Sequence, residues 1–448
     1  MYRLLFLQFL RSRAVMASLV LILILGGISI GIGHQFLSQK KAAIDQVESH
    51  QKSHIERNVE LHKDDLGLLM YYLKFAFVNS PNHLAGLSIG QSDINPNVQR
   101  ITIKNLEGQR YDTDLVNPMN LQSGNLDLSF VLIYLFPLLI IVFTFNLLSE
   151  ETETGTWRLV SVQTPSKLKY LLTKLSVRMI LIYVVLGILL SVAKIALSIP
   201  LDANFMMFVL LSSLYIIFWF ALCFFIINFK KNSGFNAVLL LSVWLVLLIL
   251  LPAGINAYVT NKYPVPEALS TMISQRDGYH TKWDTDKKET LQKFYEHYPQ
   301  FEKFGYPTEG FNWTWYYAMQ QMGDDESLKD TRAFRQKINE RENASKQLSA
   351  FLPNMHLQLA FNELSGTSLR QHLNFLDATG DFHEKLRLFF YPSIFKGLSG
   401  DAIDWAKFTP KYNISDTSDK KHNRFIWPLL IASFIIFLGC IIIGRRLH

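Results

Sequence analysis

Six long apolar runs alternate with polar segments along the chain. The runs cover residues 14–33, 128–148, 179–199, 204–228, 235–258 and 425–444. Each has about 20 residues or more, and an α-helix of that length crosses the roughly 30 Å of hydrocarbon in a bilayer. The pattern therefore predicts a mainly α-helical membrane protein with six transmembrane helices.

Residues 1–13 form a short amphipathic segment before the first run. Arg3, Arg11 and Arg13 lie among apolar residues, which is typical of a helix in the cytoplasmic membrane interface. The run at 14–33 is longer than the core of a signal peptide and lacks an A-x-A-like cleavage site, so we interpret it as a retained anchor rather than a cleaved signal.

A first polar insertion, residues 34–127, follows this anchor. It begins with a helical pattern from Lys40 to Asp65, which would extend the first span beyond the membrane. An alternating, strand-like stretch follows at Arg100–Lys104. We therefore expect a mixed α/β insertion.

A second polar insertion, residues 259–424, has mostly helical patterning. Ser327 is a candidate N-cap for a helix that runs to about Ala350, and the helix is expected to end at Leu352-Pro353. A helical pattern then resumes from Leu357 to Leu386. This insertion is predicted to be mainly α-helical.

The distribution of basic residues predicts the orientation. If both termini are cytoplasmic, the cytoplasmic segments, which include the loop 149–178 and the tail 445–448, carry twelve Lys and Arg residues against three Glu residues. Positive charge is enriched on the cytoplasmic side of membrane proteins, so we predict cytoplasmic termini and two extracytoplasmic insertions. The formal net charge of +7 thus reflects topology. Nucleic acid is not an expected partner.

Motifs for catalysis are missing from the sequence. It contains no G-x-x-x-x-G-K-[ST] phosphate loop and no G-x-S-x-G nucleophile motif. His383-Glu384 is like the start of a zinc-binding H-E-x-x-H helix, but Arg387 stands where the second ligand belongs. The two cysteines, Cys223 and Cys440, lie within apolar runs. We expect no enzymatic activity, metal or cofactor in this chain.

An aromatic cluster, Phe311–Tyr317, has three interpretations. It is suited to stacking against a ligand, to the outer membrane–water interface, or to the core of the second insertion. Lys194, near the end of one run, either extends its ammonium group towards the interface or contacts a substrate.

The short polar loop at 149–178 is the strongest candidate for a functional element. Three acids, Glu150, Glu151 and Glu153, precede Gly155-Thr156, and basic residues follow as far as Arg178. Thr164 and Pro165 are suited to be the N-cap and first residue of a helix, so we predict two short helices with a corner between them. The alternative is a solvated basic loop that only sets topology.

These residues resemble a known family. Glu151–Thr156, then Arg158-Leu159-Val160 and Thr164-Pro165, resemble the E-x-E-x-G-T…L…P pattern of ABC-2-type transporter permeases, which are similar to type V exporters. In that family the pattern follows the second span and forms the cytoplasmic coupling element.

Three further stretches resemble the subgroup that carries the domain DUF3526. They are Leu87–Asp93 with Pro96, Asp127–Phe130, and Leu352-Pro353 through Leu364–Thr367 to His372 and Phe375-Leu376. Two positions depart from the pattern: Thr152 stands where the family often has a basic residue, and Ser365 where alanine is common.

The resemblance implies a permease subunit in the bacterial cytoplasmic (inner) membrane. Its partners would be a separate ABC ATPase subunit that binds ATP and Mg²⁺, a second permease chain (an identical copy or a paralogue), membrane lipid, and an envelope partner as a further candidate. The implied ATPase interface consists of Glu151, Glu153, Gly155, Thr156, Arg158 and Pro165.

Three functions remain open at this point. The first is an ATP-driven exporter permease, and the sparse intramembrane charge favours an amphiphilic cargo over small ions. The second is an ATPase-driven relay of motion to an envelope partner without solute transport. The third is a membrane scaffold or receptor that is not energised.

Overall fold

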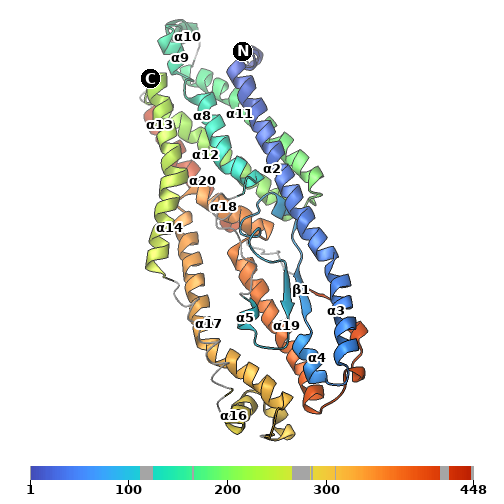
Figure 1. Cartoon of the computed structure of the whole chain (residues 1–448). Helices are drawn as coiled ribbons and strands as arrows, with labels where there is room; N and C mark the ends of the chain where they lie inside the picture. The colour runs from blue at the N-terminus through green and yellow to red at the C-terminus, as the bar shows by residue number, and fades with distance from the viewer. Residues whose placement is uncertain are drawn as a thin grey trace.

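The computed structural model describes residues 2–110, 125–163, 166–264, 283, 286–307, 309–413 and 423–444. These residues form an elongated, mainly helical molecule with apolar helices at one end and the two insertions at the other (Figure 1). The start of α1 (Tyr2–Leu10), the corner between α9 and α10, and the end of α20 lie together at the end opposite α16.

Five helices in the described part of the chain are long and apolar enough to cross a membrane. They are Arg13–His62 (α2 Arg13–Asp45 and α3 Val47–His62), Leu128–Glu153 (α7 Leu128–Phe130, η2 Val131–Leu135, α8 Phe136–Thr144 and α9 Ser149–Glu153), α11 (Lys167–Ala196), α12 (Ala203–Ile227), and Ser233–Lys262 (α13 Ser233–Leu245, η3 Val246–Leu250 and α14 Leu251–Lys262). The sixth run is the helix α20 (Asn423–Gly444), whose described apolar part, Arg424–Cys440, is shorter. The six-span count therefore stays a prediction.

The first apolar helix continues beyond its predicted run. α2 extends to Asp45 and α3 follows almost without a break, so the predicted helical extension at Lys40–Asp65 is confirmed. α1 is separated from α2 at Ser12, and it packs against α11 and α2.

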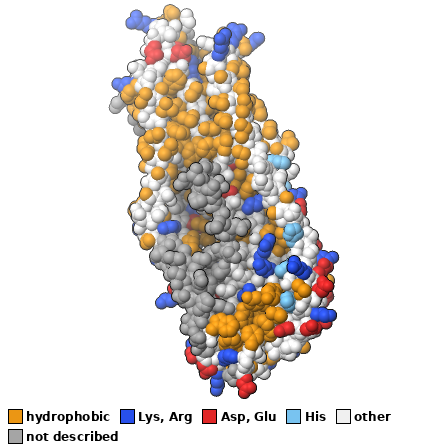
Figure 2. Space-filling view, in the orientation of Figure 1, with side chains coloured by type: hydrophobic (Ala, Val, Ile, Leu, Met, Phe, Trp, Pro, Cys, Tyr) orange, Lys and Arg blue, Asp and Glu red, His pale blue; other side chains and the backbone are white. Residues whose placement is uncertain are grey.

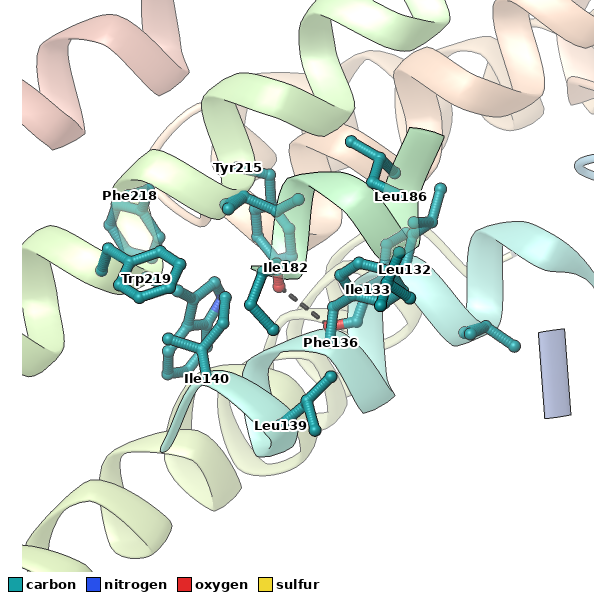
Figure 3. Close-up of a cluster of buried hydrophobic side chains, with 14 of the residues drawn as sticks. Leu132, Ile133, Phe136, Leu139, Ile140, Ile182, Leu186, Tyr215, Phe218 and Trp219 are labelled. Atoms are coloured by element: carbon teal, nitrogen blue, oxygen red, sulfur yellow. Dashed lines mark hydrogen bonds between the residues drawn. The ribbon is translucent and has the colours of Figure 1, made fainter. Parts of the chain in front are cut away.

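Two prolines widen the apolar helices into π-helical turns. η2 precedes Pro137 and η3 precedes Pro252. Proline has no amide hydrogen and its ring clashes with the carbonyl four residues earlier, so the local helix must adjust. The Ile133 carbonyl, which Pro137 cannot bond, accepts a hydrogen bond of 3.0 Å from the Tyr215 hydroxyl of α12 (Figure 3). A buried polar group in the apolar core is thereby satisfied.

The two insertions share one sheet and one core. β1 (Phe75–Asn79) lies between β2 (Val98–Ile101), its antiparallel neighbour, and β3 (Lys411–Asn413), its parallel neighbour from the second insertion. A single apolar cluster contains residues of both insertions, among them Leu69, Phe77, Phe294 and Phe390. The remaining short elements of this unit are α4 (Leu66–Tyr72), η1 (His83–Gly86), α5 (Glu107–Arg110), α16 (Lys287–His297), η4 (Pro299–Phe304), η5 (Gly400–Ala402) and η6 (Trp405–Lys407). We call this combined structure the distal unit.

Three long helices form the frame of the second insertion. They are α17 (Trp313–Ser349), α18 (Pro353–Ser365) and α19 (Leu369–Phe395). The predicted break at Leu352-Pro353 is confirmed, but the predicted start at Ser327 is wrong: Asn312 caps α17, and Ser327 lies buried within it. The aromatic residues after Asn312 form the first turns because they pack into the distal core.

This packing decides between the interpretations of the aromatic cluster. Trp315, Tyr316 and Tyr317 are buried, and the Tyr317 hydroxyl donates to the Gly67 carbonyl over 2.9 Å. Only Phe311 is largely exposed among the cluster's large side chains. Most of the cluster is therefore core of the distal unit.

Candidate functional site

The predicted coupling loop forms two short helices with a corner between them. α9 (Ser149–Glu153) and α10 (Trp157–Gln163) meet at Gly155, whose φ of 73° is the left-handed conformation that glycine adopts readily. Thr164 and Pro165 lie outside the described residues. The described N-cap of α11 is Ser166, whose hydroxyl accepts a hydrogen bond from the Lys169 amide.

Glu151 joins α9 to α11. Its carboxylate lies 2.7 Å from the Lys174 ammonium, and the two side chains are only 13% and 12% exposed. The Tyr170 hydroxyl donates to the same oxygen, and Lys174 also donates to the Leu147 carbonyl. A shielded, hydrogen-bonded ion pair of this kind holds two elements in one relative position.

Glu153 joins α9 to α13. One carboxylate oxygen accepts the Ser233 amide over 2.7 Å, and the other accepts the Ser233 hydroxyl over 2.9 Å. Ser233 is the first residue of α13, so the negative charge sits at the positive end of the helix dipole. Ser149 adds a hydroxyl contact of 2.7 Å to Ser233.

The six residues of the implied ATPase interface therefore occupy different settings. Glu151 and Glu153 have partners within the chain, whereas Gly155, Thr156 and Arg158 are exposed at the tip, and Pro165 is not described. Leu159 and Val162 of α10 are also strongly exposed, at 66% and 86%. The sequence analysis named Leu159 only as part of the family pattern and did not name Val162, because their exposure cannot be read from a helix in which four of seven residues are apolar.

Arg178, the last basic residue of the predicted loop, is buried rather than solvated. It lies within α11, is 5% exposed, and its guanidinium stacks 5.1 Å from the Phe9 ring of α1. Phe9 in turn contacts Phe143 of α8 edge to face. α1 is thus tied to the same bundle end as α9.

A second polar cluster lies where the apolar helices meet the distal unit. Asp127, the N-cap of α7, accepts hydrogen bonds from the Ile89 amide, the Ser129 hydroxyl and the Phe130 amide over 2.7–2.8 Å. The Ser88 hydroxyl donates to the Asn362 side chain over 2.7 Å. Three sequence stretches more than thirty residues apart thus meet at one place, which we call the junction.

The junction continues through α18 to the C-terminal apolar helix. α18 packs against α12 and α20, and Phe361 stacks on Phe208 of α12. Glu363 of α18 is 6% exposed at its side chain and pairs with Arg370, with Lys346 at 3.6 Å and with Arg424 at 3.4 Å. α17, α18, α19 and α20 therefore share one buried carboxylate.

The histidine that resembled a zinc ligand has a structural partner instead. His383 is buried and its Nε2 contacts the Lys104 carbonyl at 2.6 Å, while Arg387 pairs with Asp324 at 2.9 Å. Among the described residues, no group of three or more His, Cys, Asp or Glu side chains is placed to hold a metal ion.

Two family comparisons agree with these observations. Residues 89–215 match the family described as ABC-2 membrane transporter related, and residues 269–413 match the domain of unknown function DUF3526. No curated protein and no solved structure matches the chain. The first match covers part of the junction, α9, α10 and α11, and the second covers most of the second insertion. The chain is therefore a multi-pass membrane protein with a segment related to ABC-2 membrane transporters and with a DUF3526 domain.

Proposed function

We propose that the chain is the permease subunit of an ATP-binding-cassette exporter, driven by a separate ATPase subunit that docks on the tip formed by α9 and α10. The observation that carries this proposal is the double attachment of α9. Glu151 ties it to α11 and Glu153 ties it to α13. A force applied at the tip passes directly into two apolar helices.

In this mechanism Glu151 and Glu153 transmit movement, and the exposed residues of the tip make the contact. Thr156, Arg158, Leu159 and Val162 are exposed at the tip and form the docking surface. Glu151 and Glu153 hold the docked element rigidly to the bundle, because charge-assisted hydrogen bonds fix geometry better than apolar contact alone. ATP and Mg²⁺ belong to the partner subunit, and this chain supplies no catalytic group.

The orientation that we propose rests on the basic residues of the loop and the termini. The tip, the start of α1 and the end of α20 lie at one end of the molecule (Figure 1), and we assign this end to the cytoplasmic side of the bacterial inner membrane and the distal unit to the outside. A second permease chain completes the assembly. Introduced cysteines at Thr154 and Asp401, both exposed, test this: an impermeant thiol reagent added to intact cells is expected to label Asp401→Cys only.

Docking is tested by copurification of the ATPase subunit with the full-length permease. We expect Leu159→Ser/Val162→Ser to abolish the complex without loss of folded protein, because both side chains are already exposed. Leu61→Ser, at a 63% exposed position on α3, is the matched control. An undiminished complex in the α10 double variant would contradict docking at the tip.

A second candidate function is a relay of motion to an envelope partner. The junction favours it, because α18 links α12 and α20 to the distal unit and both insertions share one sheet. Reconstitution distinguishes the two: the exporter moves an amphiphilic cargo when ATP is supplied, whereas the relay hydrolyses ATP without moving any.

A further inference from the structure

A basic hollow lies beside the tip, between α9, α10 and the turn that joins α12 to α13. Its volume is about 320 Å³, and its walls include Thr152, Glu153, Trp157, Lys167, Lys230 and Lys231. Three lysines from two separate parts of the chain therefore line one space. The hollow borders the apolar bundle and is not part of the exposed α10 surface.

The charge in this hollow is not balanced by the described residues. Glu153 is the one acid in its wall, and its two oxygens already accept hydrogen bonds from Ser233. Within the described chain, no carboxylate lies within ion-pair distance of Lys167, Lys230 or Lys231. Clustering like charges is unfavourable, so an anion that enters the hollow gains binding energy from all three.

The backbone at this turn is also strained. Lys230 has a φ of 55°, a left-handed conformation that costs a residue with a Cβ roughly 1–2 kcal/mol. Strain of this kind at a non-glycine residue is typical of sites that position a side chain for a ligand.

An exposed apolar strip continues from the hollow along α13. Its members recur at helical spacing and are 45–66% exposed: Phe235, Val238, Leu241 and Leu245. On the face shown in Figure 2, Lys and Arg side chains gather at the end of the molecule that carries α9 and α10, beside a band of hydrophobic side chains. The membrane orientation proposed above assigns the hollow to the level where a bilayer changes from headgroups to hydrocarbon, and Trp157 in its wall is a residue type that favours this level.

We propose that this hollow binds the phosphate headgroup of an anionic phospholipid, with Lys167, Lys230 and Lys231 holding the phosphate and an acyl chain lying along the apolar strip of α13. The three lysines account for the preference for negative charge, and the strip accounts for a lipid rather than a small soluble anion. The proposal requires membrane insertion but not an ATPase partner. Its test can therefore succeed or fail independently of the test of the proposed function.

The occupied hollow has a consequence for the tip. Glu153 and Trp157 belong both to its wall and to the α9–α10 element, and Lys230 and Lys231 precede α13. A bound headgroup bridges the same two elements that Glu153 connects. Anionic lipid is therefore expected to stabilise the attachment of α9 to α13.

The test measures the thermal unfolding midpoint of the full-length protein in detergent during titration with lipid. Wild-type protein is expected to be stabilised by phosphatidylglycerol at concentrations at least tenfold below those needed for phosphatidylcholine. Inorganic phosphate and glycerol 3-phosphate are the soluble probes, and both are expected to have little effect. Equal stabilisation by a soluble probe would overturn the assignment to lipid, and no preference for phosphatidylglycerol would overturn the site itself.

Variants locate the effect within the molecule. Lys167→Gln/Lys231→Gln is expected to reduce the phosphatidylglycerol preference about tenfold or more, whereas Lys167→Arg/Lys231→Arg retains it. Arg11→Gln/Arg13→Gln removes the same charge at the same end of the molecule, outside the hollow, and is expected to retain the preference. If Arg11→Gln/Arg13→Gln lost the preference as much as Lys167→Gln/Lys231→Gln, the attraction would be diffuse and the proposal would be contradicted. A lysine variant that loses only ATPase binding would also contradict it, because the hollow would then receive an acidic protein segment.

Discussion

At the scale of single residues, close backbone contacts decide where the helices sit. A Cβ added at Gly33 of α2 would lie 1.9 Å from the Gly86 carbonyl oxygen, which is a backbone atom. No side chain rotation relieves such a clash. The first apolar helix therefore needs glycine at this point to approach η1, whereas a Cβ at Gly27 on the same helix meets nothing within 4 Å.

We expect Gly33→Ala to destabilise the protein by about 1–3 kcal/mol or more, through overpacking at the contact between α2 and η1. Gly27→Ala is the control, and it is expected to be neutral or slightly stabilising because alanine favours the helix. Thermal unfolding of both variants in detergent makes the comparison. A neutral Gly33→Ala would show that α2 is free to move away from η1.

Tyr215 has a comparable role inside the bundle. Removal of its hydroxyl in Tyr215→Phe leaves the Ile133 carbonyl without its 3.0 Å donor beside Pro137. The expected cost is about 0.5–2 kcal/mol, the range for polar contacts within membranes. Tyr183→Phe provides a comparison, because it removes a similar hydroxyl contact to the Ser213 carbonyl at a half-buried position. If Tyr215→Phe cost no more stability than Tyr183→Phe, the Ile133 carbonyl that Pro137 cannot bond would have no special need for its hydroxyl donor.

At the scale of elements, α9 is a short helix that is attached to both α11 and α13. It has only five residues, too few to be stable alone. Its position depends on Glu151 and Glu153, which contact α11 and α13. The sequence pattern predicted two short helices and a corner, but the partners of the acids are remote in sequence and no local signal named them.

A double-mutant cycle measures this attachment. For Glu151→Gln and Lys174→Gln we expect a coupling energy of about 1–3 kcal/mol, because both side chains are shielded from water. The exposed pair Lys52 and Glu56, 4.0 Å apart on α3, is the control and is expected to couple by less than about 0.5 kcal/mol. Similar coupling energies in the two cycles would mean that the Glu151 contact does not hold α9 in place.

At the scale of the whole molecule, the distal unit is a single cooperative structure built from both insertions. It contains the buried histidine His383 and the half-buried histidine His372. Burial, with a contribution from Arg387, lowers the pKa of His383 well below its usual value, and burial lowers the pKa of His372 to about 4. The unfolded chain keeps the ordinary pKa near 6.5.

The pH dependence follows from these directions. Well above pH 6.5 both histidines are neutral in the folded and in the unfolded state, and the folded protein keeps its full stability. As the pH falls below 6.5, the unfolded state binds protons that the folded state does not, so stability is lost. We expect His383 alone to contribute a loss of up to about 2 kcal/mol between pH 7 and pH 5.

Unfolding midpoints at pH 7 and pH 5 make the measurement. His383→Gln is expected to show a smaller change between the two pH values than wild type, whereas the exposed control His50→Gln is expected to behave as wild type. Identical pH dependence in His383→Gln and wild type would exclude His383 as a source of acid sensitivity.

The periodic pattern of apolar residues determined much of this protein by itself. It predicted six long apolar helices, of which five in the described residues are long and apolar enough to cross a membrane, and also the extension of the first beyond its apolar run and the end of α17 before Leu352-Pro353. These features depend on local hydrophobicity and on proline chemistry, so a single stretch of sequence contains the information. The family resemblance was likewise visible in local motifs, and the comparisons confirm it.

Only the tertiary structure decided the rest. The helix α17 begins at Trp313 and not after the predicted cap Ser327, because the aromatic residues of its first turns pack into the distal core. The two insertions became one unit because β3 pairs with β1 more than 300 residues away. Glu151 and Glu153 acquired partners in α11 and α13. Each outcome depends on long-range contacts, which bury apolar surface or satisfy buried charges that no local pattern records.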